Sequence, residues 1–395
     1  MENQNSYQEV TTEGWGSRLM GSIKSVLFGI LLFFGSFVVI WWNEGRAVRT
    51  AKGLDEGASQ VVSIDANSAT SASDGKLVHV TGKVVTEDLL KDDEFGIEVN
   101  ALKLRRQVVM YQWVEEEESK KEKQVGGSEK TTTTYNYEKK WVSNLVNSGD
   151  FKVSEGHMNP KAFPYGEYTH QVSNASLGNF AVSQSLLSKI NNFNAFSIDK
   201  IDTGKVKKAT ILEDAVNKKQ NIYIGEGTNA DPQIGDVKLT FQIVEPGDYS
   251  IVAKQVGNTF EKFNTSTGTS IEMVSAGIFS QENMFQAAQK SNTITTWIFR
   301  LVGFLVMFFG LTLIFKPLVV LADVLPFLGN LLSMGLSFFS GIVALSLSLA
   351  TMAIAWIFYR PVLGISLLIV GIGMIIFFYI RSSKKKKLVA ATVSS

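Results

Sequence analysis

The chain has 395 residues, of which 45% are hydrophobic and 19% are charged, and its formal net charge is +1. Ordinary soluble domains contain about 25% charged residues, so the deficit indicates lipid-facing segments, while the near-neutral charge offers no pull toward nucleic acid. The absence of cysteine excludes disulfides, thiolate metal sites and cysteine nucleophiles, and three histidines leave little material for a metal centre. We therefore expect no cofactor, no metal and no nucleic-acid partner.

The first transmembrane helix is predicted at residues 23–42, after a cytoplasmic tail at residues 1–22. Residues 26–42 contain no charge, and about 20 apolar residues at a rise of about 1.5 Å cross a hydrocarbon core of about 30 Å. No small-residue cleavage site follows this run, and Trp41 and Trp42 are typical of an interfacial anchor. A retained span is therefore favoured over a signal peptide.

A polar block, Asn43, Glu44, Gly45 and Arg46, follows the first span directly. One interpretation is a docking or headgroup-binding site at the membrane surface. The other is a helix end, at which Gly45 terminates the helix and the side chains of Glu44 and Arg46 bond locally. The second interpretation is favoured.

Residues 43–292 predict an extracytoplasmic α+β domain in which strands predominate. β-branched residues indicate a strand at 77–85, and alternation indicates another at 102–115, whose hairpin partner is expected at 135–146. The charged segment 115–130 has no apolar face, and a solvated hairpin loop is favoured there over a binding site.

Further along this domain, a Pro-Gly-Asp turn separates two strands, 236–244 and 249–255, and predicts a hairpin. Amphipathic helices are expected at residues 183–193 and 280–289, and the second is placed to lead into the next span.

Four polar residues invite a functional interpretation: Arg105, Arg106, His79 and His157. Consecutive residues on a strand point to opposite faces, so one arginine must face inward or lie at a covered edge, and a structural ion pair is favoured over an anion site. No nucleophile or acid partner can be named for His157, so loop-ordering hydrogen bonds are favoured over a general base. His79 lies within a strand and is expected to be structural, and we expect no catalytic residues.

Three more transmembrane helices are predicted at residues 293–315, 336–359 and 362–380. Arg300 lies close to the start of the first of these, where its long side chain can reach the interface. The fold class is therefore a multi-pass α-helical membrane protein, with one N-terminal span, three C-terminal spans and a large β-rich domain.

Residues 316–335 are expected to form an interfacial or re-entrant connector. Lys316 and Pro317 are expected to end the preceding helix, because proline interrupts helical hydrogen bonding. A carboxylate such as that of Asp323 costs about 2.5–3.5 kcal/mol at the bilayer centre, and Pro326 again opposes a continuous helix.

Small residues recur at steps of four and three along residues 336–359, which places them on one helix face. Such a seam lets another helix approach closely, either within the chain's own bundle or between copies of the chain, and the sequence leaves both alternatives open. The seam consists of Ser337, Gly341, Ala344, Ser348, Thr351 and Ala355.

The strongest basic cluster beside any span is Lys384, Lys385, Lys386 and Lys387, in a basic tail at residues 381–395. The positive-inside rule places this tail in the cytoplasm, and four spans then place the N-terminus there too and the β-rich domain outside. Basic residues just after the first span argue weakly against this orientation. The lysines could also hold anionic lipid, at about 1 kcal/mol per residue, but a topology signal is the favoured interpretation.

Sequence blocks in both the apolar and the polar parts resemble the transmembrane protein 43 family, also called LUMA, in the same order and with the same layout of one span plus three. They lie at residues 43–47, 54–57, 76–79, 103–106, 110–115, 156–160, 235–237, 291–292, 296–297 and 356–361. The resemblance implies a self-associating membrane scaffold with a lumenal loop and no established catalytic residues. In animals the family lies in the endoplasmic reticulum and inner nuclear membrane and is tied to retention of emerin and lamins, and members also occur in bacteria.

The leading functional prediction is therefore a non-catalytic membrane organiser that contacts membrane lipid, forms a homo-oligomer and meets other membrane or envelope proteins. It would lie in a bacterial cytoplasmic membrane, or in the endoplasmic reticulum or inner nuclear membrane of a eukaryote. An enzyme acting on lipid or envelope substrates is the alternative, although the sequence lacks the serine-hydrolase, zinc-protease and P-loop motifs. A channel or transporter is less favoured, because the spans contain little charge.

Overall fold

The computed structural model describes residues 5–67, 71–196, 206, 208–213, 220–362, 364–366 and 369. Contacts divide the chain into two compact units. The β-rich unit comprises Met1–Thr12, Gly53–Glu122 and Lys130–Ala288, and the helical unit comprises Glu13–Lys52, Lys123–Glu129 and Gln289–Ser395.

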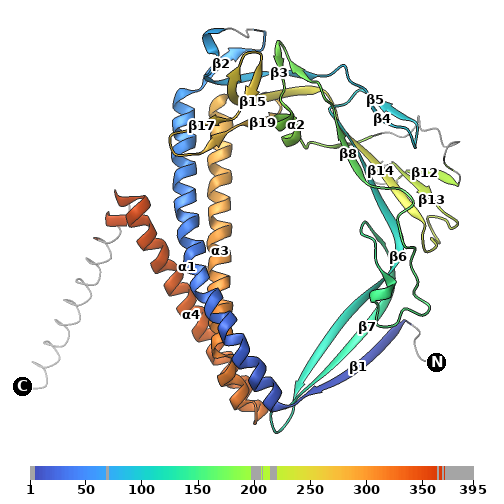
Figure 1. Ribbon diagram of the computed structural model, residues 1–395, viewed down its shortest axis with the longest axis vertical. Helices are drawn as coiled ribbons and strands as arrows, with labels where there is room; N and C mark the ends of the chain where they lie inside the picture. The colour runs from blue at the N-terminus through green and yellow to red at the C-terminus, as the bar shows by residue number, and fades with distance from the viewer. Residues whose placement is uncertain are drawn as a thin grey trace, which may run out of the picture. The chain divides into compact units, whose positions relative to one another are not determined.

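Three long helices dominate the helical unit: α1 (Trp15–Gln60), α3 (Gln281–Ala322) and α4 (Pro326–Tyr359) (Figure 1). Among the described residues, these are the helices long and apolar enough to cross a membrane. At a rise of about 1.5 Å per residue, each is longer than a hydrocarbon core of about 30 Å. The expected fourth span, residues 362–380, lies largely outside the described residues.

Glycines allow α1 and α3 to approach closely. A Cβ atom at Gly310 would lie 2.7 Å from the backbone nitrogen of Phe33, and one at Gly29 would lie 2.8 Å from the carbonyl oxygen of Gly310. Lipid tails are as apolar as the helices, so close packing between small residues is a main source of helix association in a membrane. The buried residues Ile40, Met307, Leu311 and Ala344 then join all three helices in one apolar cluster.

The helix ends differ from the sequence prediction in three places. Pro317 lies inside α3, which runs on to Ala322, so the expected connector at 316–335 is helical except for the turn before Pro326. A membrane helix tolerates proline where neighbouring groups bond to the backbone carbonyl that the proline leaves without a donor. The prediction applied only the rule that proline ends a helix. At the other end, α1 starts at Trp15, inside the expected tail, and continues through Gly45.

Strands form most of the β-rich unit. Among the described residues, an eight-stranded sheet has the order β1-β7-β6-β14-β13-β12, with β11 and β8 paired to β14 and β6. Its strands are β1 (Ser6–Glu13), β6 (Lys103–Lys123), β7 (Glu129–Val142), β8 (Tyr168–Gln171), β11 (Asn194–Ala195), β12 (Ala209–Glu213), β13 (Gln220–Ile224) and β14 (Val237–Val244).

A second sheet, of seven strands, has the order β19-β15-β16-β10-β9-β3-β2, with β15 also paired to β3. Its strands are β2 (Val62–Asp65), β3 (Leu77–Val85), β9 (Ser176–Leu177), β10 (Phe180–Ala181), β15 (Gly247–Val256), β16 (Thr259–Glu261) and β19 (Met273–Ala276). Two further pairs are β4 (Leu90–Asp92) with β5 (Ile97–Val99) and β17 (Phe263–Asn264) with β18 (Ser270–Ile271).

The main core of the β-rich unit draws on both sheets. In β6, alternate residues from Leu104 to Gln112 are buried, as the period of two in a half-buried strand requires. A short helix, α2 (Gln184–Lys189), packs Leu186 and Leu187 into this core, and the hydroxyl of Ser183 caps its N-terminus. The expected strand at 77–85 has the same bounds as β3.

Two strand predictions were wrong. The strands β14 and β15 flank the Pro-Gly-Asp turn but join different sheets, so the turn carries the chain from one sheet to the other and forms no hairpin. The charged segment 115–130 is largely exposed and contains the end of a hairpin, as expected, but most of it is strand, because β6 and β7 continue through it to a tight turn at Gly126 and Gly127, both with positive φ.

The N-terminal strand β1 pairs with β7. Because β1 precedes α1 in the chain and β7 follows it, segments before and after this long apolar helix belong to the same sheet. The backbone N–H of Tyr137 donates to the carbonyl of Asn5 at 2.9 Å, and Lys152 forms an ion pair with Glu9 at 2.8 Å. The expected N-terminal tail therefore contains a strand and the first turns of α1.

Candidate functional site

Glu44 lies at the centre of a polar network where α1, α3 and α4 meet. Its carboxylate is fully buried. It accepts hydrogen bonds from Arg300 Nε at 2.6 Å and Nη2 at 3.0 Å, and from the indole N–H of Trp356 at 2.8 Å. The paired geometry is the bidentate form of an arginine–carboxylate contact, which fixes orientation as well as charge. One carboxylate therefore ties three helices together.

The neighbouring residues extend this network along α1 and α3. Asn43 Nδ2 donates to the carbonyl of Thr296 at 3.0 Å, and Arg46 Nη1 donates to Asn292 Oδ1 at 3.1 Å. Arg46 Nη2 donates to Asn43 Oδ1 at 3.1 Å and to Thr296 Oγ1 at 3.2 Å. Arg46 thus bonds to neutral oxygens only, and its buried Nε has no hydrogen-bond partner among the described residues.

Gly45 has a packing role here and does not end the helix. A Cβ atom at Gly45 would lie 2.7 Å from the ring of Tyr359. The absent side chain therefore lets α4 approach α1. Of the two interpretations of this block, the helix end at Gly45 was wrong, because α1 continues to Gln60. Arg46 does bond locally to Asn43, but Glu44 and Arg46 also bond to residues of α3.

A second ionic cluster surrounds Asp323, in the turn between α3 and α4. The carboxylate is fully buried and pairs with Arg18 at 2.5 Å and Lys123 at 2.7 Å. The tip of the β6–β7 hairpin belongs to this unit, and the backbone N–H of Gly126 donates to the carbonyl of Val324 at 3.0 Å. Two cations thus offset the cost of burying the charge of Asp323, the cost for which the sequence argued against a further span here.

The small-residue seam of α4 lies mainly against the chain's own helices. Ala344, Ser348, Thr351 and Ala355 are buried, and the hydroxyl of Ser348 contacts the sulfur of Met307 at 3.7 Å. Ser337 and Gly341 are half-buried, and a Cβ atom at Gly341 would meet one described neighbour, Phe308, at 3.9 Å. The four lysines Lys384, Lys385, Lys386 and Lys387 lie outside the described residues.

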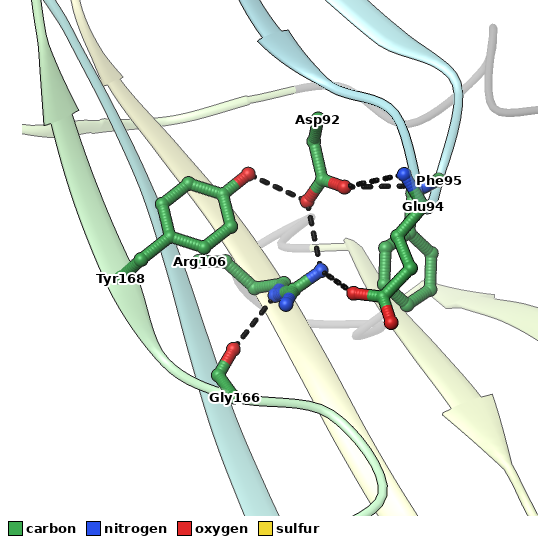
Figure 2. A network of polar contacts seen from close by, with 6 residues as sticks. All are labelled: Asp92, Glu94, Phe95, Arg106, Gly166 and Tyr168. Carbon is green, nitrogen blue, oxygen red and sulfur yellow. Dashed lines mark hydrogen bonds and ion pairs between the residues drawn. The ribbon is translucent and has the colours of Figure 1, made fainter.

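In the β-rich unit, Arg106 forms the ion pair that the sequence favoured (Figure 2). Its Nη1 lies 3.0 Å from Asp92 and 2.6 Å from Glu94, and its Nε donates to the carbonyl of Gly166 at 2.8 Å. The hydroxyl of Tyr168 donates to Asp92 at 2.5 Å. Burial, followed by this hydrogen bond, raises the pKa of Tyr168 above its usual value, so the phenol stays protonated as a donor.

Arg105 and the two histidines are also held by structural contacts. Arg105 lies over the ring of Phe193, 3.9 Å from its centroid, and bonds to Gln242. His157 is buried, stacks on Tyr137 at 4.0 Å between ring centroids, and contacts the carbonyl of Val153 at 3.1 Å through Nδ1. Burial and a hydrogen bond to Glu115 raise the pKa of Tyr137 to about 12.

The imidazole of His79 bridges two segments of the β-rich unit. Its Nδ1 lies 2.9 Å from the hydroxyl of Ser63, and its Nε2 lies 3.0 Å from the carbonyl of Phe279, to which it can donate. Burial lowers the pKa of His79 and outweighs the carbonyl of Phe279 and the charge of Glu282, which raise it. In the described part of the chain, no group of three or more metal-ligating residues could hold an ion.

Sequence reasoning missed both buried ion pairs of the helical unit. Glu44 and Arg300 are 256 positions apart, and Asp323 lies 305 positions from Arg18. A signal was present in each case, because a charge at the edge of an apolar run requires a partner. Which residue serves as that partner is decided by contacts between helices far apart in the chain, and no local pattern identifies it.

The family model for transmembrane protein 43 matches residues 110–361 of the chain. Transmembrane protein 43 of Mus musculus is 34% identical over 367 residues, covering 89% of this chain and 90% of the mouse protein. The Homo sapiens protein is 34% identical over 373 residues, covering 92% and 90%. The Drosophila melanogaster homolog is 31% identical over 369 residues, covering 89% and 93%. No solved structure matches the chain significantly.

Proposed function

Because the chain belongs to the transmembrane protein 43 family, we propose that it is a non-catalytic membrane organiser that self-associates and presents its β-rich unit at a membrane surface. The chain is an integral membrane protein with helices apolar enough to span a bilayer. The role as an organiser of other proteins at the membrane is the proposed part and goes beyond the family membership.

The observation that carries the proposal is the continuity of α1 and α3. Both helices contribute to the apolar cluster of the helical unit, through Ile40 and Met307. Both also end in the second core of the β-rich unit, where Leu54 of α1 and Phe285 of α3 pack with Ile271. Two unbroken helices therefore join the membrane anchor to the presented unit, as a scaffold needs.

Self-association is proposed through α4, at the part of the seam that the described helices α1 and α3 leave open. Residues Ala344 to Ala355 are occupied within the chain, whereas Gly341 retains room for a neighbouring helix. Replacing Gly341 with leucine should lower the crosslinked oligomer fraction in native membranes. The matched control is Gly335→Leu on the same helix, where a Cβ atom meets no neighbour within 4 Å.

An oligomer fraction that is unchanged in Gly341→Leu, or lowered equally in Gly335→Leu, would remove this part of the proposal. Proximity labelling of the full chain in its own host tests the wider role. A reproducible set of neighbouring membrane proteins is expected, whereas substrate turnover by the purified chain would replace the organiser with an enzyme.

The orientation of the chain in the membrane and the identity of that membrane are predicted separately, and two observations on orientation point in different directions. The lysines at 384–387 favour cytoplasmic termini and an outside β-rich unit. The pairing of β1 with β7 favours one side for the N-terminus and the unit, because paired strands lie about 5 Å apart and a hydrocarbon core is about 30 Å thick. The membrane itself, bacterial cytoplasmic or endoplasmic-reticulum and inner nuclear, stays a prediction.

A further inference from the structure

A cavity of about 330 Å³ opens between α1, α3 and α4 beside Glu44. This volume falls in the range of small-ligand sites, which begins at about 300 Å³. The polar and aromatic side chains that could contact a ligand in this cavity include Asn292, Thr293, Trp297, Arg300, Trp356 and Arg360.

The cavity has an excess of positive charge. The described residues that line it include two arginines and no acid, and Glu44 pairs with one of these arginines, Arg300. Arg46 donates its hydrogen bonds to neutral oxygens, including that of the lining residue Asn292, and the charge of Glu44, which pairs with Arg300, also acts on it. Arg360 lines the cavity, and its guanidinium has no hydrogen bond or ion pair with a described residue. The described side chains at the cavity thus include three arginines, Arg46, Arg300 and Arg360, around the one carboxylate of Glu44, which is a net excess of two positive charges.

An uncompensated guanidinium beside apolar helices is costly, so an anion in the cavity would stabilise the site. Arginine presents a planar fork of donors that matches phosphate oxygens. Tryptophan is enriched at the headgroup level of a bilayer, and Trp297, which is 62% exposed, lies beside Arg300 with its ring centroid 4.7 Å from the guanidinium.

We infer that this cavity binds the phosphodiester of a glycerophospholipid headgroup, with Arg360 as its main contact and the Glu44–Arg300 pair holding the wall in place. An anionic headgroup is preferred over a zwitterionic one, because the site has two positive charges to match. The inference rests on the proposed function in one respect, namely that α1, α3 and α4 lie in a membrane.

The test uses the purified full chain and native mass spectrometry with added phosphatidylglycerol, phosphatidylcholine, diacylglycerol or inorganic phosphate. The variant is Arg360→Gln, which leaves the Glu44–Arg300 pair untouched. The matched control is Lys290→Gln, which removes one positive charge from an exposed position of α3 outside the cavity lining.

Phosphatidylglycerol should bind best and diacylglycerol, which lacks the phosphate, worst. Hydrogen bonds to charged groups contribute about 1.5–3 kcal/mol, so Arg360→Gln should weaken phosphatidylglycerol binding by about 10- to 100-fold. Lys290→Gln should change binding little, and all three proteins should have the same melting temperature.

Equal weakening in both variants, no weakening in Arg360→Gln, or equal retention of diacylglycerol would overturn the inference. Binding of inorganic phosphate without any preference for the phospholipids would assign the site to a free anion instead. Carbonate extraction of the unmodified chain separates this inference from the proposed function. If the unmodified chain stays in the membrane but shows no preference for phosphatidylglycerol over diacylglycerol, the headgroup site alone is refuted. If carbonate releases the unmodified chain from membranes, both the headgroup site and the proposed function are refuted.

Discussion

The two units of the protein each contain a buried arginine–carboxylate pair completed by an aromatic donor. In the helical unit, Glu44 accepts from Arg300 and from the indole of Trp356. In the β-rich unit, Asp92 accepts from Arg106 and from the hydroxyl of Tyr168. The two sites use the same chemistry but differ in their surroundings.

The two sites differ in the number and kind of donors that hydrogen-bond to each carboxylate. They also differ in whether acids or arginines are in excess around it. Asp92 also accepts from the backbone N–H groups of Glu94 and Phe95, at 3.1 Å and 3.2 Å, and a second acid shares its arginine. Glu44 depends on side chains from two other helices and has arginines in excess around it. The donors to Asp92 therefore come largely from its own surroundings and a second acid balances the charge, whereas the described residues around Glu44 carry an excess of positive charge.

The largest expected effect is that of Arg300→Met. Removing one partner of a buried ion pair typically costs about 3–5 kcal/mol, because the other charge is left uncompensated. Glu44 would keep only the indole of Trp356, so we expect a loss near the upper end, measured as the fall in free energy of unfolding in detergent. Arg106→Met should cost less, because Asp92 keeps three other donors.

The double variant Glu44→Gln with Arg300→Met provides the control, because removal of both charges avoids an unpaired one. It should be more stable than Arg300→Met alone. If Arg106→Met proved the more damaging single change, the contrast between the two networks would be wrong.

A smaller effect is expected from the aromatic donors. Trp356→Phe and Tyr168→Phe each remove one hydrogen bond to a charged group, which contributes about 1.5–3 kcal/mol. The loss of stability should be near the upper end of this range for Trp356→Phe. It should be near the lower end for Tyr168→Phe, because backbone N–H groups still donate hydrogen bonds to Asp92. Thermal unfolding of the two variants side by side measures the difference, and equal losses would count against it.

The smallest expected effect is a dependence of the stability of the β-rich unit on pH. Burial lowers the pKa of His79, so as the pH falls below the ordinary histidine value of about 6.5, the unfolded chain takes up a proton before the folded chain does. Stability should therefore fall between neutral and mildly acidic pH and level off below the folded-state pKa. Urea unfolding midpoints at several pH values measure this slope.

In His79→Gln this part of the slope should disappear. The exposed His170 supplies the matched control, because His170→Gln should leave the slope in place. A slope that persists unchanged in His79→Gln would show that other groups cause it.

Local patterns predicted much of the fold, and non-local contacts account for the rest. The bounds of β3 and the burial alternation of β6 follow from β-branched residues and from period-two spacing. The separation of β14 and β15 into different sheets does not, because turn residues specify a change of direction but not a pairing partner. The sequence favoured an inward-facing arginine at 105 or 106 but could not name Asp92 or Tyr168.

The orientation of the chain is open to a direct measurement, because the protein has no native cysteine. Single variants Gln8→Cys in β1 and Lys76→Cys in the β-rich unit can be treated with a membrane-impermeant maleimide from each side of sealed vesicles. Reaction from the same side is expected if β1 stays paired with β7 in the membrane. Reaction from opposite sides is expected if α1 crosses the bilayer.

The same method tests the central claim, that α1, α3 and α4 lie in lipid and hold the β-rich unit at its surface. Leu345, on the exposed face of α4, is replaced by cysteine and compared with Lys76→Cys in intact vesicles. We predict that Lys76→Cys reacts from one side only and that Leu345→Cys reacts from neither side until detergent is added. Ready labelling of Leu345→Cys from water in intact vesicles would contradict the account.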